Sequence, residues 1–258
     1  MTLVTREHLL GQLHDLGIRN DNLMLVHSNV AGADMSEIFA CFEALRESVA
    51  PRGTIAFPTF TFDFCKGKPY DCRKTPSHMG LLTEIARRHR DVYRIYHPIY
   101  GFALFGAEAE TLAAQIHNVS SYGDDSLFGE IRRRDGQILI INLPFAHSMT
   151  FFHHVEEIVG CDYRFMKSFT GEVINNSGTS EIKTYTMWVR DVDRGVITTV
   201  EPMGRRLESL GLVKEGHLGR WPVKLLEAGK VFEAMKRVPH EEPELLRKID
   251  PSLAGVFF

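Results

Sequence analysis

The chain has 258 residues, of which 44% are hydrophobic, and this is enough for one substantial core. The net charge is -3, and no basic run is longer than Arg132-Arg133-Arg134, so we expect no nucleic-acid partner. No apolar run approaches the roughly 20 residues of a membrane span, and residues 1–7 lack an apolar segment behind basic residues. These features predict a cytoplasmic protein that does not enter a membrane.

The four cysteines are scattered along the chain and form no CxxC pair. They are Cys41, Cys65, Cys72 and Cys161. Such spacing supports neither a zinc site nor a disulfide framework. We therefore expect reduced thiols and no metal, with Cys41 on the apolar side of a helix.

The first 60 residues have the pattern of a β-α-β unit. A helix is predicted between Thr5 as its N-cap and Gly17, and an apolar strand follows over residues 22–26. Asp34 and the Glu37 three residues later have the spacing of a capping box, which begins a second helix. A strand over residues 54–57 completes the unit and predicts a parallel sheet with right-handed crossovers.

The middle of the chain continues with alternating strands and helices. Residues 62–76 show no period and are expected to form an irregular loop that could cover a site. We expect a helix capped by Ser77, strands over 92–96 and 101–106, a helix through Leu112 and Ile116, a helix from Leu127, and a buried strand over 137–143.

The last third changes in character. Residues 163–173 and 181–190 alternate polar and apolar side chains around a turn at 175–178, which predicts an antiparallel hairpin. Helices are expected from Pro202 to Gly211 and over 231–238. The predicted fold is α/β, with a largely parallel central sheet flanked by helices. It is a single domain over 1–258, with an α/β core over 1–160 and a hairpin and helical additions over 161–258.

The segment 146–157, which directly follows the buried strand, contains the most functional-looking residues. On a helix, Phe151, Phe152, Val155, Ile158 and Val159 share one face, and Thr150, His153, His154 and Glu157 share the other. Glu157 can reach His153 at i, i+4, while Glu156 lies three residues after His153 at the margin of the polar face. The pattern suits a histidine base held by a carboxylate, and a solvated helix face is the alternative.

Other chemistries lack their signals in this chain. It contains no P-loop, G-x-G-x-x-G, H-E-x-x-H or G-x-S-x-G motif, which argues against phosphoryl transfer, dinucleotide redox chemistry, zincin proteolysis and ordinary esterase chemistry. A metal site made of His27, His97, His153 and Glu157 fits no familiar ligand spacing.

Several short motifs follow one another along the chain. They are Leu25-Val26-His27-Ser28, Gly53-Thr54 through Pro58-Thr59, Ser77-His78-Met79-Gly80, Arg94 with His97-Pro98, Gly106, Ser126, and Thr150 through Glu156. Taken in order, they resemble the aminoglycoside 3-N-acetyltransferase (antibiotic acetyltransferase) family. They span roughly residues 10 to 160. The resemblance implies acetyl transfer from acetyl-CoA, as co-substrate, to an amine.

The resemblance also assigns roles to residues. The histidine of T-x-x-H-x-x-E is the family's general base, which maps onto His153, with Glu156 as the matching acid and Glu157 kept as the second choice. Thr150 and backbone amides after His27-Ser28 are candidate oxyanion donors. The expected CoA contacts are His27, Ser28, Asn29 and Ser126. The loop from Ser28 leads to the helix near Asp34, and a helix N-terminus favours phosphate. The expected acceptor contacts are Thr59, His97, Tyr100 and Arg164.

The acceptor is predicted to be an amino sugar. The segments Phe64 to Lys68 and Tyr163 to Lys167 resemble surface-polysaccharide amino-sugar acetyltransferases of lipopolysaccharide biosynthesis. Near the expected site, Asp63 and Asp71 are accompanied by Lys66, Lys68, Arg73, Lys74, Arg164 and Lys167. These cations would suit a diphosphate, so we expect a nucleotide-linked amino sugar. Solvated surface charges and contacts with the CoA phosphates are the alternative interpretations of the same residues. An aminoglycoside, as in antibiotic resistance, is the alternative; a metal-dependent hydrolase and a non-catalytic CoA- or sugar-binding module are further ones. The sequence leaves open whether the chain forms a homodimer.

Overall fold

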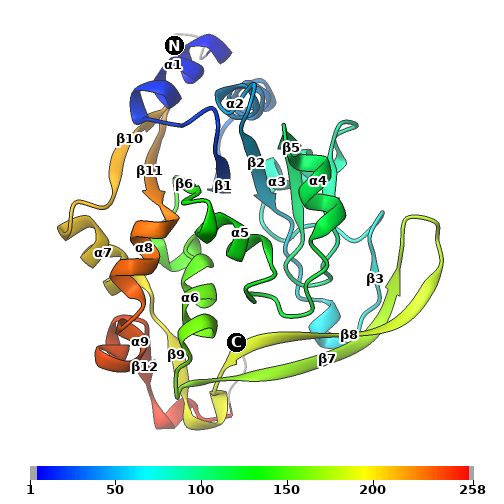
Figure 1. The fold of residues 1–258 in the computed structure, drawn as a ribbon, viewed down its shortest axis with the longest axis vertical. Helices are drawn as coiled ribbons and strands as arrows, with labels where there is room; N and C mark the ends of the chain where they lie inside the picture. The colour runs from blue at the N-terminus through cyan, green and yellow to red at the C-terminus, as the bar shows by residue number, and fades with distance from the viewer. Residues whose placement is uncertain (1–4, 256–258) are drawn as a thin grey trace.

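The computed structural model describes residues 5–255 and is built around a seven-stranded sheet with the order β10-β11-β6-β1-β2-β5-β4 (Figure 1). Its strands are β1 (Leu23–Ser28), β2 (Thr54–Pro58), β4 (Tyr93–Ile95), β5 (Phe102–Gly106), β6 (Gln137–Ile141), β10 (Lys214–Leu218) and β11 (Trp221–Glu227). At the centre, β1 pairs in parallel with both β2 and β6, whereas the outer pairs are antiparallel. Strands β10, β6, β1, β2 and β4 therefore point one way, and the predicted α/β class with a largely parallel sheet is confirmed.

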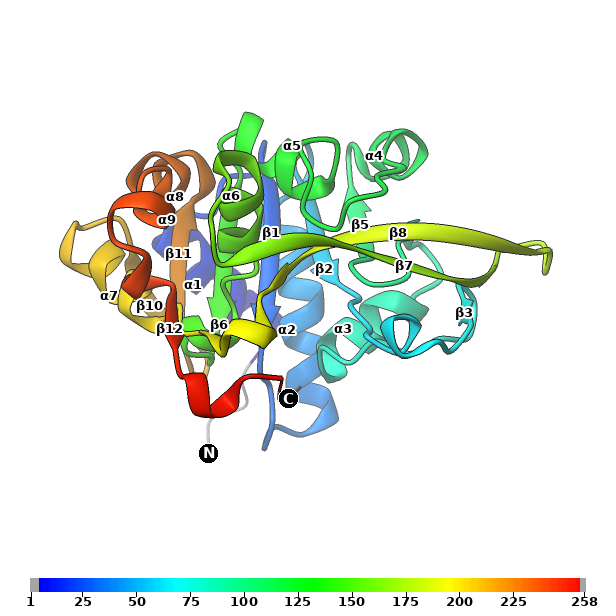
Figure 2. The ribbon, with the colours of Figure 1, turned by 90° about the horizontal axis from the view of Figure 1, so that it is seen from below.

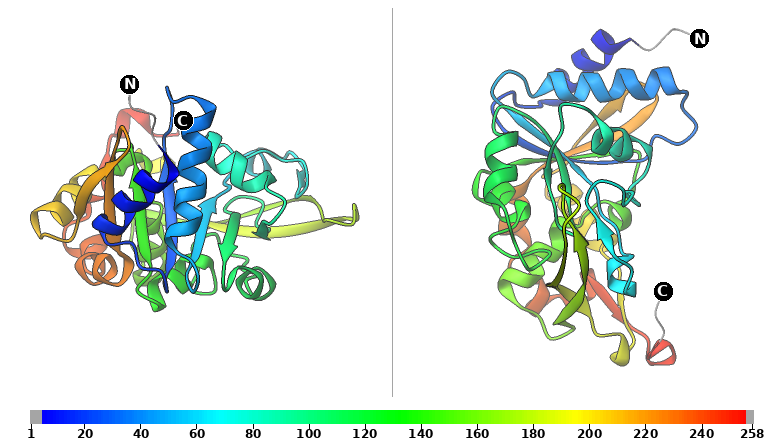
Figure 3. Two further views of the ribbon diagram at one scale, coloured as in Figure 1. Left: turned by 90° about the horizontal axis from the view of Figure 1, so that it is seen from above. Right: turned by 90° about the vertical axis from the view of Figure 1, so that its right-hand side faces the viewer.

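Helices cover both faces of this sheet (Figures 2 and 3). One layer contains α1 (Arg6–Leu16), α2 (Met35–Ser48) and α3 (Leu81–Arg88); the other contains α4 (Ala109–Gln115), α5 (Leu127–Arg133), α6 (Phe151–Val159) and α8 (Ala228–Met235). Each face has its own hydrophobic core. Because side chains alternate along a strand, Met24 and Val26 enter one core and Leu23 and Leu25 enter the other.

Local signals set the ends of the first two helices as the sequence predicts. The Thr5 hydroxyl accepts a hydrogen bond from the His8 amide, and Gly17 ends α1 in the left-handed region at a φ of 96°. Asp34 and Glu37 form a complete capping box at α2. Cys41 is buried on the apolar side of α2, as expected.

The predicted hairpin is confirmed and forms a long arm. Strands β7 (Arg164–Ile174) and β8 (Ser180–Arg190) pair antiparallel over their full lengths and project from the body (Figures 2 and 3). The β8 edge of the arm is held by backbone hydrogen bonds between Thr186 and the segment 119–121. The β7 edge pairs in parallel with β3 (Tyr70–Asp71). The loop over 62–76 is thus more regular than predicted, because it contains β3 and the 3-10 turn η1 (Phe64–Lys66).

Two further predictions need correction. Ser77 does not cap α3, whose N-cap is Gly80; the Ser77 hydroxyl instead accepts from the Met79 amide. The C-terminal part also supplies more than a hairpin and helices, since β10 and β11 extend the central sheet beside β6.

The remaining elements lie in the C-terminal part or connect the larger ones. They are η2 (Phe145–His147), η3 (Val192–Arg194), β9 (Val196–Thr198), α7 (Glu201–Ser209), α9 (Val238–Glu241), η4 (Pro243–Leu245), β12 (Arg247–Ile249) and η5 (Pro251–Leu253). Within residues 5–255, no helix is long and apolar enough to cross a membrane. Residues 1–4, part of the segment predicted to contain no signal peptide, lie outside the described range.

Candidate active site

His153 and Glu156 on α6 form a hydrogen-bonded pair. The distance from His153 Nδ1 to Glu156 Oε2 is 2.6 Å, and Glu156 is completely buried. Glu156 also accepts a hydrogen bond from the Tyr163 hydroxyl at 2.9 Å and forms an ion pair with Arg164 Nε at 2.9 Å. Arg164 is the first residue of β7, so the base of the hairpin brings a counter-charge to the buried carboxylate.

Burial and charge decide which atom of this pair can take up a proton. Burial lowers the pKa of His153, and the Arg164 guanidinium lowers it further, so the ring is neutral at neutral pH. Burial alone would raise the pKa of Glu156, but Arg164 and the His153 hydrogen bond outweigh it, and the net pKa is lowered. A carboxylate at Nδ1 assigns the ring proton to that nitrogen. Nε2 then carries the lone pair of a base.

Glu157, the second choice for this partner, has a different role. Its Oε1 accepts a hydrogen bond from the Ser120 hydroxyl at 2.5 Å, and burial raises its pKa. His154 lies beside it on α6, fully buried, with Nδ1 2.6 Å from the Tyr122 carbonyl oxygen. The two residues therefore fasten the segment 120–122 to α6, and the predicted polar face is in large part an internal contact surface.

His153 opens on a cavity of about 460 Å³ under the base of the hairpin, here called the hairpin cavity. Tyr100 and Arg164, both expected acceptor contacts, line it, together with Tyr122, which the sequence reasoning missed. Four cationic side chains face the cavity: Lys66, Arg164, Lys167 and Arg190. Among the described residues that line it there is no Asp or Glu.

A second cavity, of about 550 Å³, lies at the carboxyl end of β1 and is here called the α2–α3 cavity. Ser28 and Asn29, two of the expected CoA contacts, line it together with residues 30–33 and 78–81. The N-terminus of α2 is closed by its own Asp34 carboxylate, whereas Gly80 gives α3 no side-chain cap. The first-turn amides of α3 are therefore left without a side-chain cap, whereas those of α2, the helix expected to favour a CoA phosphate, are capped.

His97 and Thr59, expected to contact the acceptor, do not line the hairpin cavity. The His97 Nδ1 accepts hydrogen bonds from the amides of Ile99 and Tyr100 at 3.1 and 2.9 Å, and burial lowers the pKa of this histidine to about 4. The ring thus fixes the backbone that carries Tyr100. Thr59 is buried and accepts a hydrogen bond from Arg94.

Three further predicted residues also lie outside both cavities. Ser126 is buried and donates its hydroxyl to the Gly123 carbonyl oxygen at 2.6 Å, so it shapes the turn before α5. Thr150 is the N-cap of α6 but makes no side-chain cap bond. His27 is buried on β1 with no partner for Nε2, and burial lowers its pKa to about 4. We therefore do not assign these three side chains a direct contact with either ligand.

The candidate metal ligands do not come together. Within residues 5–255, no group of three or more His, Cys, Asp or Glu side chains has a geometry that could hold a metal ion. The four cysteines are free thiols.

Comparison with known proteins identifies the family. The family model for aminoglycoside 3-N-acetyltransferase matches residues 25–238. Aminoglycoside N(3)-acetyltransferase IX of Micromonospora chalcea is 23% identical over 270 residues, which cover 89% of this chain and 91% of that protein. Aminoglycoside N(3)-acetyltransferase IV of Salmonella sp is 26% identical over 158 residues, and the match covers 60% of this chain and 59% of that protein.

Solved structures share the fold. AAC-IIIb, in a binary structure with CoASH, superposes with a TM-score of 0.77 at 20% identity and covers 90% of this chain and 94% of that one. AAC-VIa bound to sisomicin gives a TM-score of 0.75 at 20% identity, with 89% and 95% covered. The family match spans the strand that ends in His27-Ser28, the helix with the His153–Glu156 pair and the hairpin. The chain therefore belongs to the aminoglycoside 3-N-acetyltransferase family and is an acetyl-CoA-dependent N-acetyltransferase.

Proposed function

We propose that the protein transfers the acetyl group of acetyl-CoA to an amino group of an aminoglycoside. The observation that carries the proposal is the buried His153–Glu156 pair, which opens on the hairpin cavity, while the α2–α3 cavity lies at the end of β1. The curated relatives are named for aminoglycoside N(3)-acetylation, and AAC-VIa is solved with sisomicin. These names favour an aminoglycoside over the nucleotide-linked amino sugar predicted from the sequence.

The pair supplies the proton transfer that the reaction needs. An ammonium group with a pKa near 10 must lose a proton before its nitrogen can attack a thioester. His153 Nε2 accepts that proton, and the Glu156 carboxylate stabilises the imidazolium that forms. Arg164 and Tyr163 keep Glu156 charged and fixed in position. Ser28, Asn29 and the N-terminus of α3 would hold CoA in the α2–α3 cavity, with the acceptor in the hairpin cavity.

The charges in the hairpin cavity favour a second candidate, an amino sugar that carries phosphate. A polycationic aminoglycoside is steered and bound best by carboxylates. Here Lys66, Arg164, Lys167 and Arg190 face the cavity, and of these Arg164 forms an ion pair with the buried Glu156 carboxylate. Arg190 lies close enough to Arg164 for its pKa to be lowered, first by burial and then by that charge. A phosphate between these side chains would relieve the repulsion.

Steady-state thiol release separates the candidates. The panel contains several aminoglycosides and several nucleotide-linked amino sugars, each assayed with acetyl-CoA. A higher kcat/KM for an aminoglycoside supports the first candidate, and a higher value for a nucleotide-linked sugar supports the second. His153→Ala should reduce kcat by about 100-fold or more at nearly unchanged CoA affinity. If no acceptor releases thiol although CoA binds tightly, the chain is a binding module and both candidates are wrong.

Lys167→Met tests which group binds to the cationic side chains of the hairpin cavity. If these side chains bind a phosphate of the acceptor, the KM of a nucleotide-linked sugar should rise several-fold while the KM of acetyl-CoA stays unchanged. If these cations instead bind the CoA phosphates, the acetyl-CoA KM rises and the preference for phosphate-bearing acceptors is refuted. Lys68→Met is the matched control, because Lys68 lies in the same loop as Lys66 but pairs with Asp63 outside the cavity lining.

A further inference from the structure

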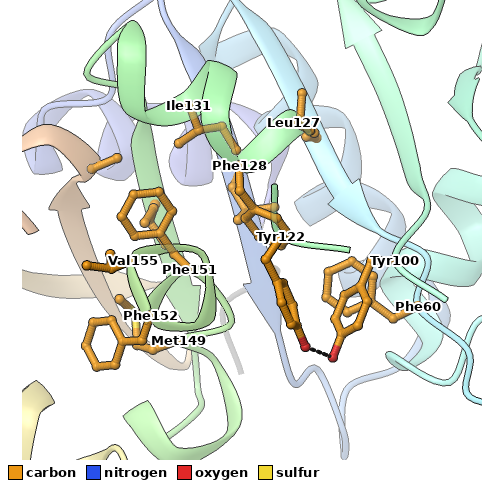
Figure 4. Packing of buried hydrophobic residues seen from close by; sticks show 14 of the residues in the cluster. Phe60, Tyr100, Tyr122, Leu127, Phe128, Ile131, Met149, Phe151, Phe152 and Val155 are labelled. Carbon is orange, nitrogen blue, oxygen red and sulfur yellow. Dashed lines mark hydrogen bonds between the residues drawn. The ribbon is translucent and has the colours of Figure 1, made fainter. Parts of the chain in front are cut away.

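Two tyrosine hydroxyls meet in the wall of the hairpin cavity. Tyr122 donates a hydrogen bond to the Tyr100 hydroxyl at 2.5 Å, and both side chains are almost fully buried (Figure 4). Phe60 and Phe128 pack around the two rings. Because Tyr122 is the donor in this bond, the Tyr100 hydroxyl keeps its own hydrogen for another acceptor. A hydroxyl that already accepts one hydrogen bond is a stronger donor in a second.

The pair is held rigidly beside the general base. The Tyr122 ring lies 5.4 Å from the His153 ring, centroid to centroid. His154 Nδ1 on α6 hydrogen-bonds to the Tyr122 carbonyl oxygen, and His97 Nδ1 accepts a hydrogen bond from the Tyr100 amide. These contacts give a reason for two buried histidines that take no direct part in proton transfer. Both hold a tyrosine in place.

The hydroxyls stay protonated over the working pH range. Burial raises the pKa of Tyr100 to about 12, and burial together with Tyr100 raises that of Tyr122 well above its ordinary value. The pair therefore offers a hydrogen-bond donor, not a base. Thr150, the donor predicted from the sequence, does not line this cavity, so the oxyanion lacks a side-chain donor from that position.

We propose that Tyr100, supported by Tyr122, donates a hydrogen bond to the acetyl oxygen as it becomes an oxyanion. The inference rests on the proposed acetyl transfer. Once the ammonium proton accepted by His153 has passed to solvent, the neutral amine nitrogen bonds to the thioester carbon and the carbonyl π pair moves to the oxygen facing Tyr100. A second proton of the nitrogen then passes to His153 Nε2. The carbonyl then re-forms, the carbon–sulfur bond breaks, and the CoA sulfur takes the proton from His153. Tyr100 keeps its own proton throughout.

The test compares three tyrosine-to-phenylalanine variants in steady-state thiol release. Tyr100→Phe should lower kcat by about 100-fold, the usual effect of removing one oxyanion donor, with the acetyl-CoA KM within twofold of wild type. Tyr122→Phe should lower kcat by about tenfold or less, because Tyr100 keeps its hydroxyl. Tyr70→Phe is the control and should match wild type, since Tyr70 is buried to the same degree on β3 but does not line the hairpin cavity.

The second readout is the loss of kcat in Tyr100→Phe, compared between different acceptors. The oxyanion belongs to the acetyl group, which every reaction shares, so Tyr100→Phe should reduce kcat by the same factor for each acceptor that turns over. An unchanged kcat with a raised acceptor KM, or a loss that varies widely between acceptors, would show that Tyr100 binds the sugar and would overturn the proposal. Thermal midpoints within 2–3 °C of the control variant, about what a change below 1 kcal/mol produces in a chain of this size, exclude misfolding as the cause. Failure of the proposed function is distinguishable, because wild type would then release no thiol with any acceptor.

Discussion

Replacing Glu156 by glutamine should damage both folding and turnover, whereas the same change at Glu157 should damage neither strongly. Glutamine keeps the shape of the side chain and can still accept the Tyr163 hydroxyl, but it carries no charge. The buried Arg164 then loses its ion-pair partner and keeps two neutral acceptors, the Trp188 carbonyl oxygen at 3.2 Å and the Thr198 hydroxyl at 2.9 Å. His153 loses the carboxylate that stabilises its charged form.

The expected magnitude follows from the burial of the pair. Breaking a buried ion pair by removing one partner costs about 3–5 kcal/mol, and Glu156→Gln should lie at the lower end because two neutral acceptors remain for Arg164. Glu157 has no ion-pair partner among the described residues, and glutamine can still accept the Ser120 hydroxyl, so its replacement should cost less than about 1 kcal/mol. In turnover, Glu156→Gln should lose about 10- to 100-fold, less than His153→Ala.

A double variant separates the two effects of Glu156. Adding Arg164→Met to Glu156→Gln removes the stranded charge, so the free energy of unfolding should recover by about 2 kcal/mol, while thiol release stays low because His153 still has no carboxylate. Guanidinium unfolding and thiol release measure the two quantities on the same samples. If Glu157→Gln lowers kcat more than Glu156→Gln does, the assignment of Glu156 as the partner of the base is wrong.

Two further predictions concern pH. The acid limb of kcat should lie below pH 6.5, because burial and Arg164 lower the pKa of His153 from 6.5; a limb centred above 7 in a pH–rate profile would contradict this. Through three buried histidines, the free energy of unfolding should change little above about pH 7.5 and fall by about 3 kcal/mol between pH 6 and 5. In that interval the unfolded chain protonates His27, His97 and His154, whose pKa values in the folded protein are about 4, and each costs up to about 1.4 kcal/mol per pH unit. Equal denaturation midpoints at pH 6 and 5 would refute it.

Local signals in the sequence were sufficient for most of the sheet and helices. The caps of α1 and α2, the strands β1, β2 and β6 and the hairpin all follow from turn residues and hydrophobic period. Strands β10 and β11 were missed for physical reasons. β10 is an edge strand with mostly exposed polar residues, and β11 contains Pro222, which argues against a strand when it is considered alone.

The site was harder to predict than the fold, because its contacts come from distant segments. The helical period placed Glu156 at the margin of a polar face, yet it is completely buried, since Arg164 and Tyr163 pack against it from beyond the helix. The family motif selected Glu156 correctly as the residue that contacts His153. No local pattern reveals that Tyr122 meets Tyr100, because only the folded chain brings the segments 120–122 and 97–100 together.

The hairpin gives this fold a way to change its specificity without changing its chemistry. Phe165, Lys167 and Phe169 of β7 wall the hairpin cavity, yet their side chains are partly or largely exposed. Substitutions at such positions usually change the folding free energy by less than about 0.5 kcal/mol. Arg164 is the exception, because it is tied to Glu156. During evolution, the arm could therefore drift to accept new amines while α6 and the strand ends proposed to hold CoA stayed under constraint.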